Sequence, residues 1–92
     1  MSWNVAQLPY LTLWKNTTAL EEGYVTGIEP GTGFPHNRRV EREAGRVPKL
    51  KPNESREFGF NVSVLTGSEI VKHAAEEIGA LQPGKPQIDS TQ

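Results

Sequence analysis

The chain has no cysteine among its 92 residues. It can therefore form no disulfide, supply no thiol nucleophile and build no thiolate metal site. The chain also lacks a large excess of charge of either sign, because its formal net charge is −1. The chain as a whole therefore has no electrostatic attraction to nucleic acid or to an anionic membrane. No apolar run approaches the length that spans a bilayer, and the N-terminus has neither the basic region nor the apolar segment of a signal peptide. We expect a cytoplasmic protein without a nucleic-acid or membrane partner.

The chain is also short, which limits the core that it can build. A single domain of this length buries about 60–65% of the surface of its unfolded chain. We expect one small domain over residues 1–82. The final residues, 83–92, have the proline, glycine and polar composition of a flexible tail.

Strand-forming residues come in several short segments. Tyr10 to Trp14 is rich in strand formers, and Tyr24 to Glu29 reads as a second strand. Arg46 to Leu50 is a possible third strand, in which Pro48 indicates an edge or a bulge. The charged stretch from residue 33 to 44 shows no usable periodicity, and we expect it to be irregular.

The clearest strand pattern lies between residues 57 and 64. Four apolar side chains alternate there with polar ones or glycine: Phe58, Phe60, Val62 and Val64. Strict alternation is typical of a half-buried antiparallel strand. If Phe60 belongs to the core, its truncation to alanine should cost about 3–5 kcal/mol.

One helix is predicted at about residues 68–80. Thr66 and Glu69 have the spacing of a capping box, with Ser68 as the competing N-cap. An apolar stripe follows at helical spacing, made by Ile70, Val71, Ala74, Ile78 and Leu81. We expect this stripe to pack in the core or in a dimer contact.

A stiff glycine- and proline-rich segment, residues 27–35, stands out as the place for a functional side chain. It puts Glu29 at the end of the second predicted strand and at the start of a loop restricted by Pro30 and Pro35. Such a loop can hold a carboxylate in place. The alternative is a strand end followed by a purely structural turn.

Several motifs in this order resemble the aldose 1-epimerase (galactose mutarotase)-like family, and most closely its bacterial members of unassigned substrate. They are Leu13-Trp14-Lys15-Asn16, Gly23 through Pro35, Glu41-Arg42-Glu43, Gly45-Arg46-Val47 and the turn Pro52-Asn53-Glu54-Ser55. The resemblance spans roughly residues 4–65 and corresponds to the C-terminal part of a much longer family domain. It implies a mainly β fold, in which about four antiparallel strands form part of a mutarotase-like supersandwich, here with one C-terminal amphipathic helix.

The resemblance also implies a chemistry for Glu29. Mutarotation of an aldose needs a base at the anomeric hydroxyl and an acid at the ring oxygen. Glu29 matches the family's catalytic glutamate, whereas the family's histidines lie in the portion that this chain does not match. His36 follows Phe34-Pro35 where family members commonly have Asn-Pro, so the resemblance gives it no catalytic role. Whether the chain is an enzyme is therefore left open.

Sugar binding needs an aromatic ring for the apolar face of a pyranose and polar groups for its hydroxyls. The expected sugar-contacting residues are Trp14, Lys15, Asn16, Thr32, Phe34, His36 and Arg38. Trp14 can equally be a core aromatic. Two histidines without supporting acidic spacing do not indicate a metal site, and we expect no cofactor.

Three functions are compatible with this sequence. The first is an aldose 1-epimerase-like protein that uses Glu29 as its base and is completed by a homo-oligomer, a dimer or larger, or by a partner chain. The second is a non-catalytic module that binds an aldose or a sugar derivative. The third is a structural or oligomerising relic of the sandwich with no sugar chemistry.

Overall fold

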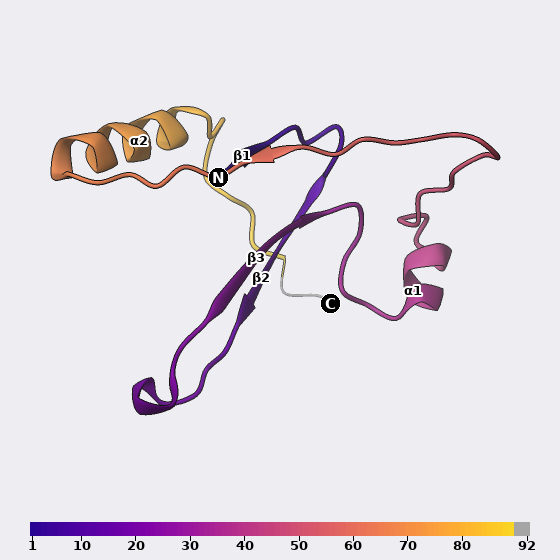
Figure 1. Ribbon diagram of the computed structural model, residues 1–92, viewed down its shortest axis with the longest axis horizontal. Coiled ribbons are helices and arrows are strands. Elements are labelled where there is room, and N and C mark those ends of the chain that lie inside the picture. The colour runs from indigo at the N-terminus through magenta and orange to yellow at the C-terminus, as the bar shows by residue number, and fades with distance from the viewer. Residues whose placement is uncertain (90–92) are drawn as a thin grey trace. The chain divides into compact units, whose positions relative to one another are not determined.

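The computed structural model describes residues 1–89. Its elements, in chain order, are β1 (Ser2–Trp3), β2 (Tyr10–Lys15), a 3-10 turn (Leu20–Glu22), β3 (Thr26–Gly31), α1 (Arg38–Glu43), β4 (Phe60–Asn61) and α2 (Ser68–Ala80) (Figure 1). Contacts divide the chain into two units, Met1–Val62 and Ser63–Gln92. The predicted domain over residues 1–82 stays a prediction, and residues 90–92 of the predicted tail lie outside the described part. Within that part, no helix has both the length and the apolar character needed to cross a membrane.

The first unit is organised by a hairpin of β2 and β3. The two strands pair antiparallel from Tyr10 opposite Gly31 to Lys15 opposite Thr26, and the 3-10 turn lies in the connection between them (Figure 1). The predicted first strand is confirmed. The predicted second strand is displaced by two residues, because the ladder continues through Pro30 to Gly31. Glu29 therefore lies inside a strand, opposite Thr12, and not at a strand end.

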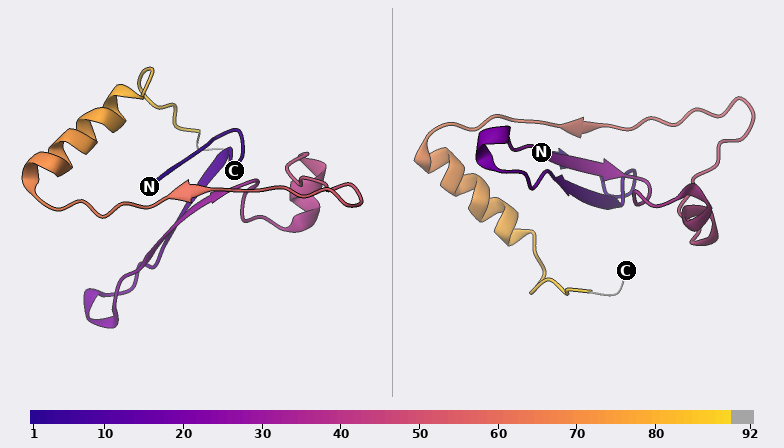
Figure 2. Two further views of the ribbon diagram at one scale, coloured as in Figure 1. Left: turned by 45° about the horizontal axis from the view of Figure 1, so that its top comes forward. Right: turned by 90° about the horizontal axis from the view of Figure 1, so that it is seen from below.

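A second small sheet joins the N-terminus to the segment with the strongest strand pattern. β1 pairs antiparallel with β4 through two residue pairs, Ser2 with Asn61 and Trp3 with Phe60. The predicted strand over residues 57–64 is wrong except for the two β4 residues, and Figure 2 shows the chain around β4 as an extended ribbon. A strand needs a partner of matching length, and β1 supplies only two residues. Phe60 is 59% exposed and is therefore not a core residue of the described chain.

Little apolar surface is buried in the described residues. Leu8 is the one apolar side chain that is buried there, and the indole Nε1 of Trp3 donates a hydrogen bond of 2.9 Å to its carbonyl oxygen. Many large apolar side chains of the described residues are exposed instead, and four of them are more than 80% exposed: Leu20, Val64, Leu81 and Ile88. The structure is thus a small arrangement of mainly antiparallel strands that leaves most of its apolar side chains uncovered.

The second unit contains α2, and its predicted range, about residues 68–80, is confirmed. The predicted capping box is wrong, because Gly67 occupies the N-cap and no side chain caps the helix. The apolar stripe is open: Ile70 and Val71 are half exposed, and Ile78 is more so. Only Ala74 of that stripe is partly buried.

Candidate functional site

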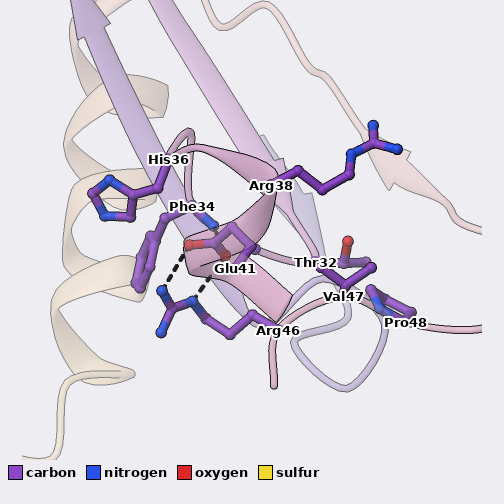
Figure 3. A pocket seen from close by; sticks show the side chains of 9 residues that line it. Thr32, Phe34, His36, Arg38, Glu41, Arg46, Val47 and Pro48 are labelled. Carbon is purple, nitrogen blue, oxygen red and sulfur yellow. Dashed lines mark hydrogen bonds and ion pairs between the residues drawn. The ribbon is translucent and has the colours of Figure 1, made fainter. Parts of the chain in front are cut away.

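The segment after β3 bends around an open hollow of about 460 Å³ in the first unit. The residues that line it are Thr32, Gly33, Phe34, His36, Arg38, Glu41, Arg46, Val47 and Pro48 (Figure 3). We call residues 32–48 the bend. The expected irregular stretch from 33 to 44 is wrong, because it contains α1. The predicted strand from Arg46 to Leu50 is also wrong, since these residues form no strand.

Helix α1 exists because both of its ends are capped. The side chain of Asn37 accepts a hydrogen bond of 2.9 Å from the Arg39 N–H, which satisfies one of the free donors of the first turn. At the other end, Gly45 has φ 72°, Gly45 N–H donates to Arg42, and Arg46 N–H donates to Glu41. These two bonds form a Schellman motif, whose left-handed position favours glycine. The chain reversal brings Arg46 back beside Glu41.

Glu41 is the buried charge of the bend. Its side chain is only 7% exposed and accepts three hydrogen bonds. Arg46 donates two of them, from Nη2 to Oε1 at 2.6 Å and from Nε to Oε2 at 2.9 Å, and the Phe34 N–H donates the third to Oε2 at 3.0 Å. Such two-pronged Arg–carboxylate pairing fixes orientation as well as distance.

These contacts determine the protonation of both partners. The hydrogen bonds from Arg46, helped by the one from the Phe34 N–H, lower the pKa of Glu41 from its ordinary value of 4.5 to about 2 against the opposing effect of burial. The same pairing raises the pKa of Arg46. At neutral pH the pair is therefore fully ionised.

The pair also positions an aromatic ring. The Arg46 guanidinium carbon lies 4.8 Å from the centre of the Phe34 ring, a cation–π arrangement. Tyr10 of β2 lies on Phe34 at 4.6 Å between ring centres, and His36 meets it edge-on at 6.0 Å. Phe34 is nevertheless 39% exposed, so part of its ring is available to a ligand.

Gly33 is required where the chain passes the buried carboxylate. A Cβ atom added there would lie 2.7 Å from Glu41 Oε2 and 3.2 Å from the Arg46 carbonyl oxygen. Any larger residue would displace the carboxylate or the backbone after α1.

Four of the predicted sugar-contacting residues, Thr32, Phe34, His36 and Arg38, line the hollow. Figure 3 shows the His36 and Phe34 rings on the same side as Arg46, whereas the Arg38 side chain extends away from the Glu41–Arg46 pair. The rings of Phe34 and His36 thus lie on one side of the hollow, and the exposed cationic side chain of Arg38 lies apart from them.

The other predicted residues lie along the hairpin. Trp14 and Glu29 lie on one face of the hairpin, because Trp14 pairs with Gly27 and Glu29 is two positions after Gly27. A Cβ atom on Gly27 would lie 2.8 Å from Glu29 Oε1 and 3.4 Å from Trp14 Cβ. Trp14 is 52% exposed, so it is not a core aromatic of the described residues. Lys15 and Asn16 follow it at the end of β2.

Glu29 is exposed and does not line the hollow. Its backbone belongs to the β2–β3 ladder, and its carboxylate makes no hydrogen bond or ion pair within residues 1–89. The structure therefore separates the predicted base from the four predicted residues in the hollow, although β3 leads directly from Glu29 to Thr32.

Sequence reasoning included Glu41 and Arg46 in the motifs of the resemblance but gave them no role, whereas in the structure they hold the bend together. Two signals pointed to them. Asn37 before a charged stretch is a typical N-cap, and Gly45 eight residues later is typical of the position that follows a helix C-terminus. Together they define a short helix, and the turn at its C-terminal end brings Arg46 back beside Glu41. Among the described residues, no three His, Asp or Glu side chains are grouped as metal ligands.

Comparison with known proteins places the chain in a family. A search of curated proteins and a search of solved structures each give no match. The family model described as "Domain of unknown function (DUF4432)" matches residues 1–64, which include both sheets and the whole bend. The chain therefore belongs to the DUF4432 family.

Proposed function

We propose that this protein binds an aldose or a closely related sugar in the hollow of the bend, as part of an aldose 1-epimerase-like site. The observation that carries the proposal is Phe34, a partly exposed ring held by its own backbone N–H, by Arg46 and by Tyr10. A pyranose needs a ring of this kind for its apolar face, and a fixed ring loses little conformational freedom on binding.

The remainder of the hollow suits the hydroxyl groups of a sugar. Thr32 supplies a hydroxyl, His36 an imidazole and Arg38 a guanidinium, each from a different position on the rim. The volume of about 460 Å³ lies in the range of small-molecule sites. Arg46 is already paired with Glu41, so its charge orients Phe34 and is not available to a ligand.

In the enzymatic form of the proposal, Glu29 is the base that removes the proton from the anomeric hydroxyl. Glu29 lies three residues before Thr32, on the strand that enters the hollow, and has an exposed carboxylate. The geometry supports sugar binding more directly than ring opening, because Glu29 does not line the hollow. In this form of the proposal the short strands described here belong to a larger mutarotase-like sandwich.

Binding is tested by titrating the protein with glucose, galactose and a hexose phosphate while following the amide NMR signals of Thr32 and Phe34. We expect saturable shifts with at least one sugar, and their loss in Phe34→Leu. Tyr24→Leu is the matched control, because Tyr24 is an exposed aromatic of the same unit outside the hollow. Equal affinity in both variants, or no shift with any sugar, contradicts the proposal.

Catalysis needs a separate measurement. Saturation-exchange NMR or polarimetry on the same aldoses reports anomer interconversion, and Glu29→Gln should abolish any acceleration while leaving the Phe34 titration unchanged. Acceleration that survives in Glu29→Gln would remove Glu29 from the role of base and leave the binding proposal intact.

A second candidate is a structural or oligomerising role without sugar chemistry. The exposed apolar side chains of the first unit favour it, among them Leu13, Ile28, Phe60 and Val62, each at least 51% exposed. Apolar surface on this scale normally belongs to an interface. A protein that associates and shows no sugar response at the hollow would support this candidate over the first.

A further inference from the structure

The two long edges of the β2–β3 hairpin differ in their capacity to pair with another strand. Asn16 N–H donates to Val25 across the hairpin, and residues in antiparallel strands alternate between hydrogen-bonded and open pairs. From this register, Trp14–Gly27 and Thr12–Glu29 are the bonded pairs. The N–H and C=O groups of alternate residues on each strand therefore point away from the hairpin.

On β3 the outward positions are Thr26, Ile28 and Pro30. Pro30 has no N–H, so it interrupts the row of donors on this edge. Proline at such a position is a common means of preventing a strand from pairing with another chain.

On β2 the outward positions are Leu11, Leu13 and Lys15, and none is a proline. Residues 1–89 supply no strand to this edge, because β2 pairs only with β3. The side chains of Leu11 and Leu13 are also about half exposed, at 45% and 54%. This edge thus offers an uninterrupted row of backbone donors and acceptors next to uncovered apolar side chains.

We propose that the outer edge of β2 is a self-association site, where β2 pairs antiparallel with β2 of a second copy about a two-fold axis at Leu13. In this register the outward groups of Leu13 face those of the partner's Leu13, and Leu11 faces the partner's Lys15. The pairing is isologous and joins two hairpins into one four-stranded sheet.

The side chains are compatible with this register. No like charges lie opposite each other, since Lys15 faces a leucine. Thr12 faces the partner's Trp14, and an aromatic residue beside a β-branched one is a favourable cross-strand pair.

A matched pair of proline variants tests the edge. Leu13→Pro removes an outward N–H from β2, and Ile28→Pro removes the outward N–H directly opposite on β3 while deleting an apolar side chain from the same face. Neither change removes a hydrogen bond within the hairpin. By light scattering after size exclusion, we expect the wild type and Ile28→Pro to have twice the mass of the chain and Leu13→Pro to have the mass of one chain.

Every other pattern contradicts the proposal. A monomeric wild type means that solvent or a different polypeptide takes the edge. Loss of the dimer in both variants means that the apolar face associates, and its retention in both means that another surface does.

Cysteine substitution keeps the backbone N–H and remains informative if a proline variant fails to fold. The natural chain has no cysteine, so a single introduced thiol can form only an intermolecular disulfide. Facing residues in a bonded antiparallel pair have Cα atoms about 5.5 Å apart, within disulfide range. Mild oxidation should link Leu13→Cys into covalent dimers and leave Ile28→Cys monomeric on a denaturing gel; equal or absent linking of the two overturns the proposal.

Discussion

The bend of residues 32–48 and the extended segment of residues 57–64 differ in where the interaction partners of their side chains lie. In the bend, the charged groups are satisfied locally, since Glu41, Arg46 and the Phe34 N–H lie within twelve positions of one another. The extended segment has four large apolar side chains, and each is about half exposed or more. Polar groups with directional bonds can organise a short segment by themselves, whereas an alternating strand depends on a neighbouring strand and on a covering layer.

The largest expected effect comes from Glu41→Gln. Whichever oxygen is replaced, an amide N–H₂ then faces a donor of Arg46 or of Phe34, and the bend loses its charge-assisted bonds. We expect the hydrogen-exchange protection of the Phe34 amide to fall by at least about tenfold. Glu43→Gln is the control, because Glu43 makes only an exposed contact of 3.8 Å with Arg39. Similar protection in the two variants would show that the bend does not depend on the buried carboxylate.

Gly33→Ala should disturb the same hydrogen bond between the Phe34 N–H and Glu41 without changing the carboxylate. The added Cβ would lie 2.7 Å from Glu41 Oε2, so the carboxylate must move away from the Phe34 N–H. The Phe34 amide signal should shift and its protection should fall, by less than in Glu41→Gln because the charge is retained. Gly59→Ala in the extended segment meets no atom within 4 Å and should leave the Phe34 signal in place.

Acid should open the bend within a defined window. The folded pKa of Glu41 is about 2, below its ordinary value of 4.5, so its stabilising effect is complete above about pH 4.5 and is lost as the pH falls through about 2. The chemical shift of the Phe34 amide should report this loss in a pH titration. In Glu41→Gln the transition should vanish, and a transition that persists there belongs to another group.

The smallest effect is expected for Phe60→Ala in the extended segment. Because the ring is 59% exposed, truncation should change the free energy of unfolding by less than about 1 kcal/mol, as at most surface positions. Urea unfolding of the chain alone measures this value. A loss of 3 kcal/mol or more would mean that a partner or a second copy covers Phe60 in solution, and dilution should then reduce the loss.

The sequence predicted some elements well for identifiable reasons. Helix α2 was predicted within its bounds, because its apolar side chains recur at a spacing that only a helix puts on one side. Strand β2 was predicted from its strand-forming residues. Around the candidate site, Thr32, Phe34, His36 and Arg38 were chosen by chemical type, and they do line one hollow.

Other features could not be predicted by local pattern. The alternation at residues 57–64 indicates which side chains would share a face of a strand, and it contains no information about whether a partner strand exists. Conversely, the charges of residues 38–46 have no period that indicates burial. Their arrangement depends on two capped helix ends, which a search for periodicity does not detect.

The sequence by itself determined the helix of the second unit, the hairpin strands and the chemical character of the glycine-rich segment, since propensity, periodicity and turn chemistry act over a few residues. Only the tertiary structure decided that Glu41 and not Glu29 is the buried carboxylate of the bend, that Arg46 lies on Phe34, and that the extended segment is uncovered. Burial and ion pairing depend on where the chain returns to itself, and the Schellman turn at Gly45 makes that return.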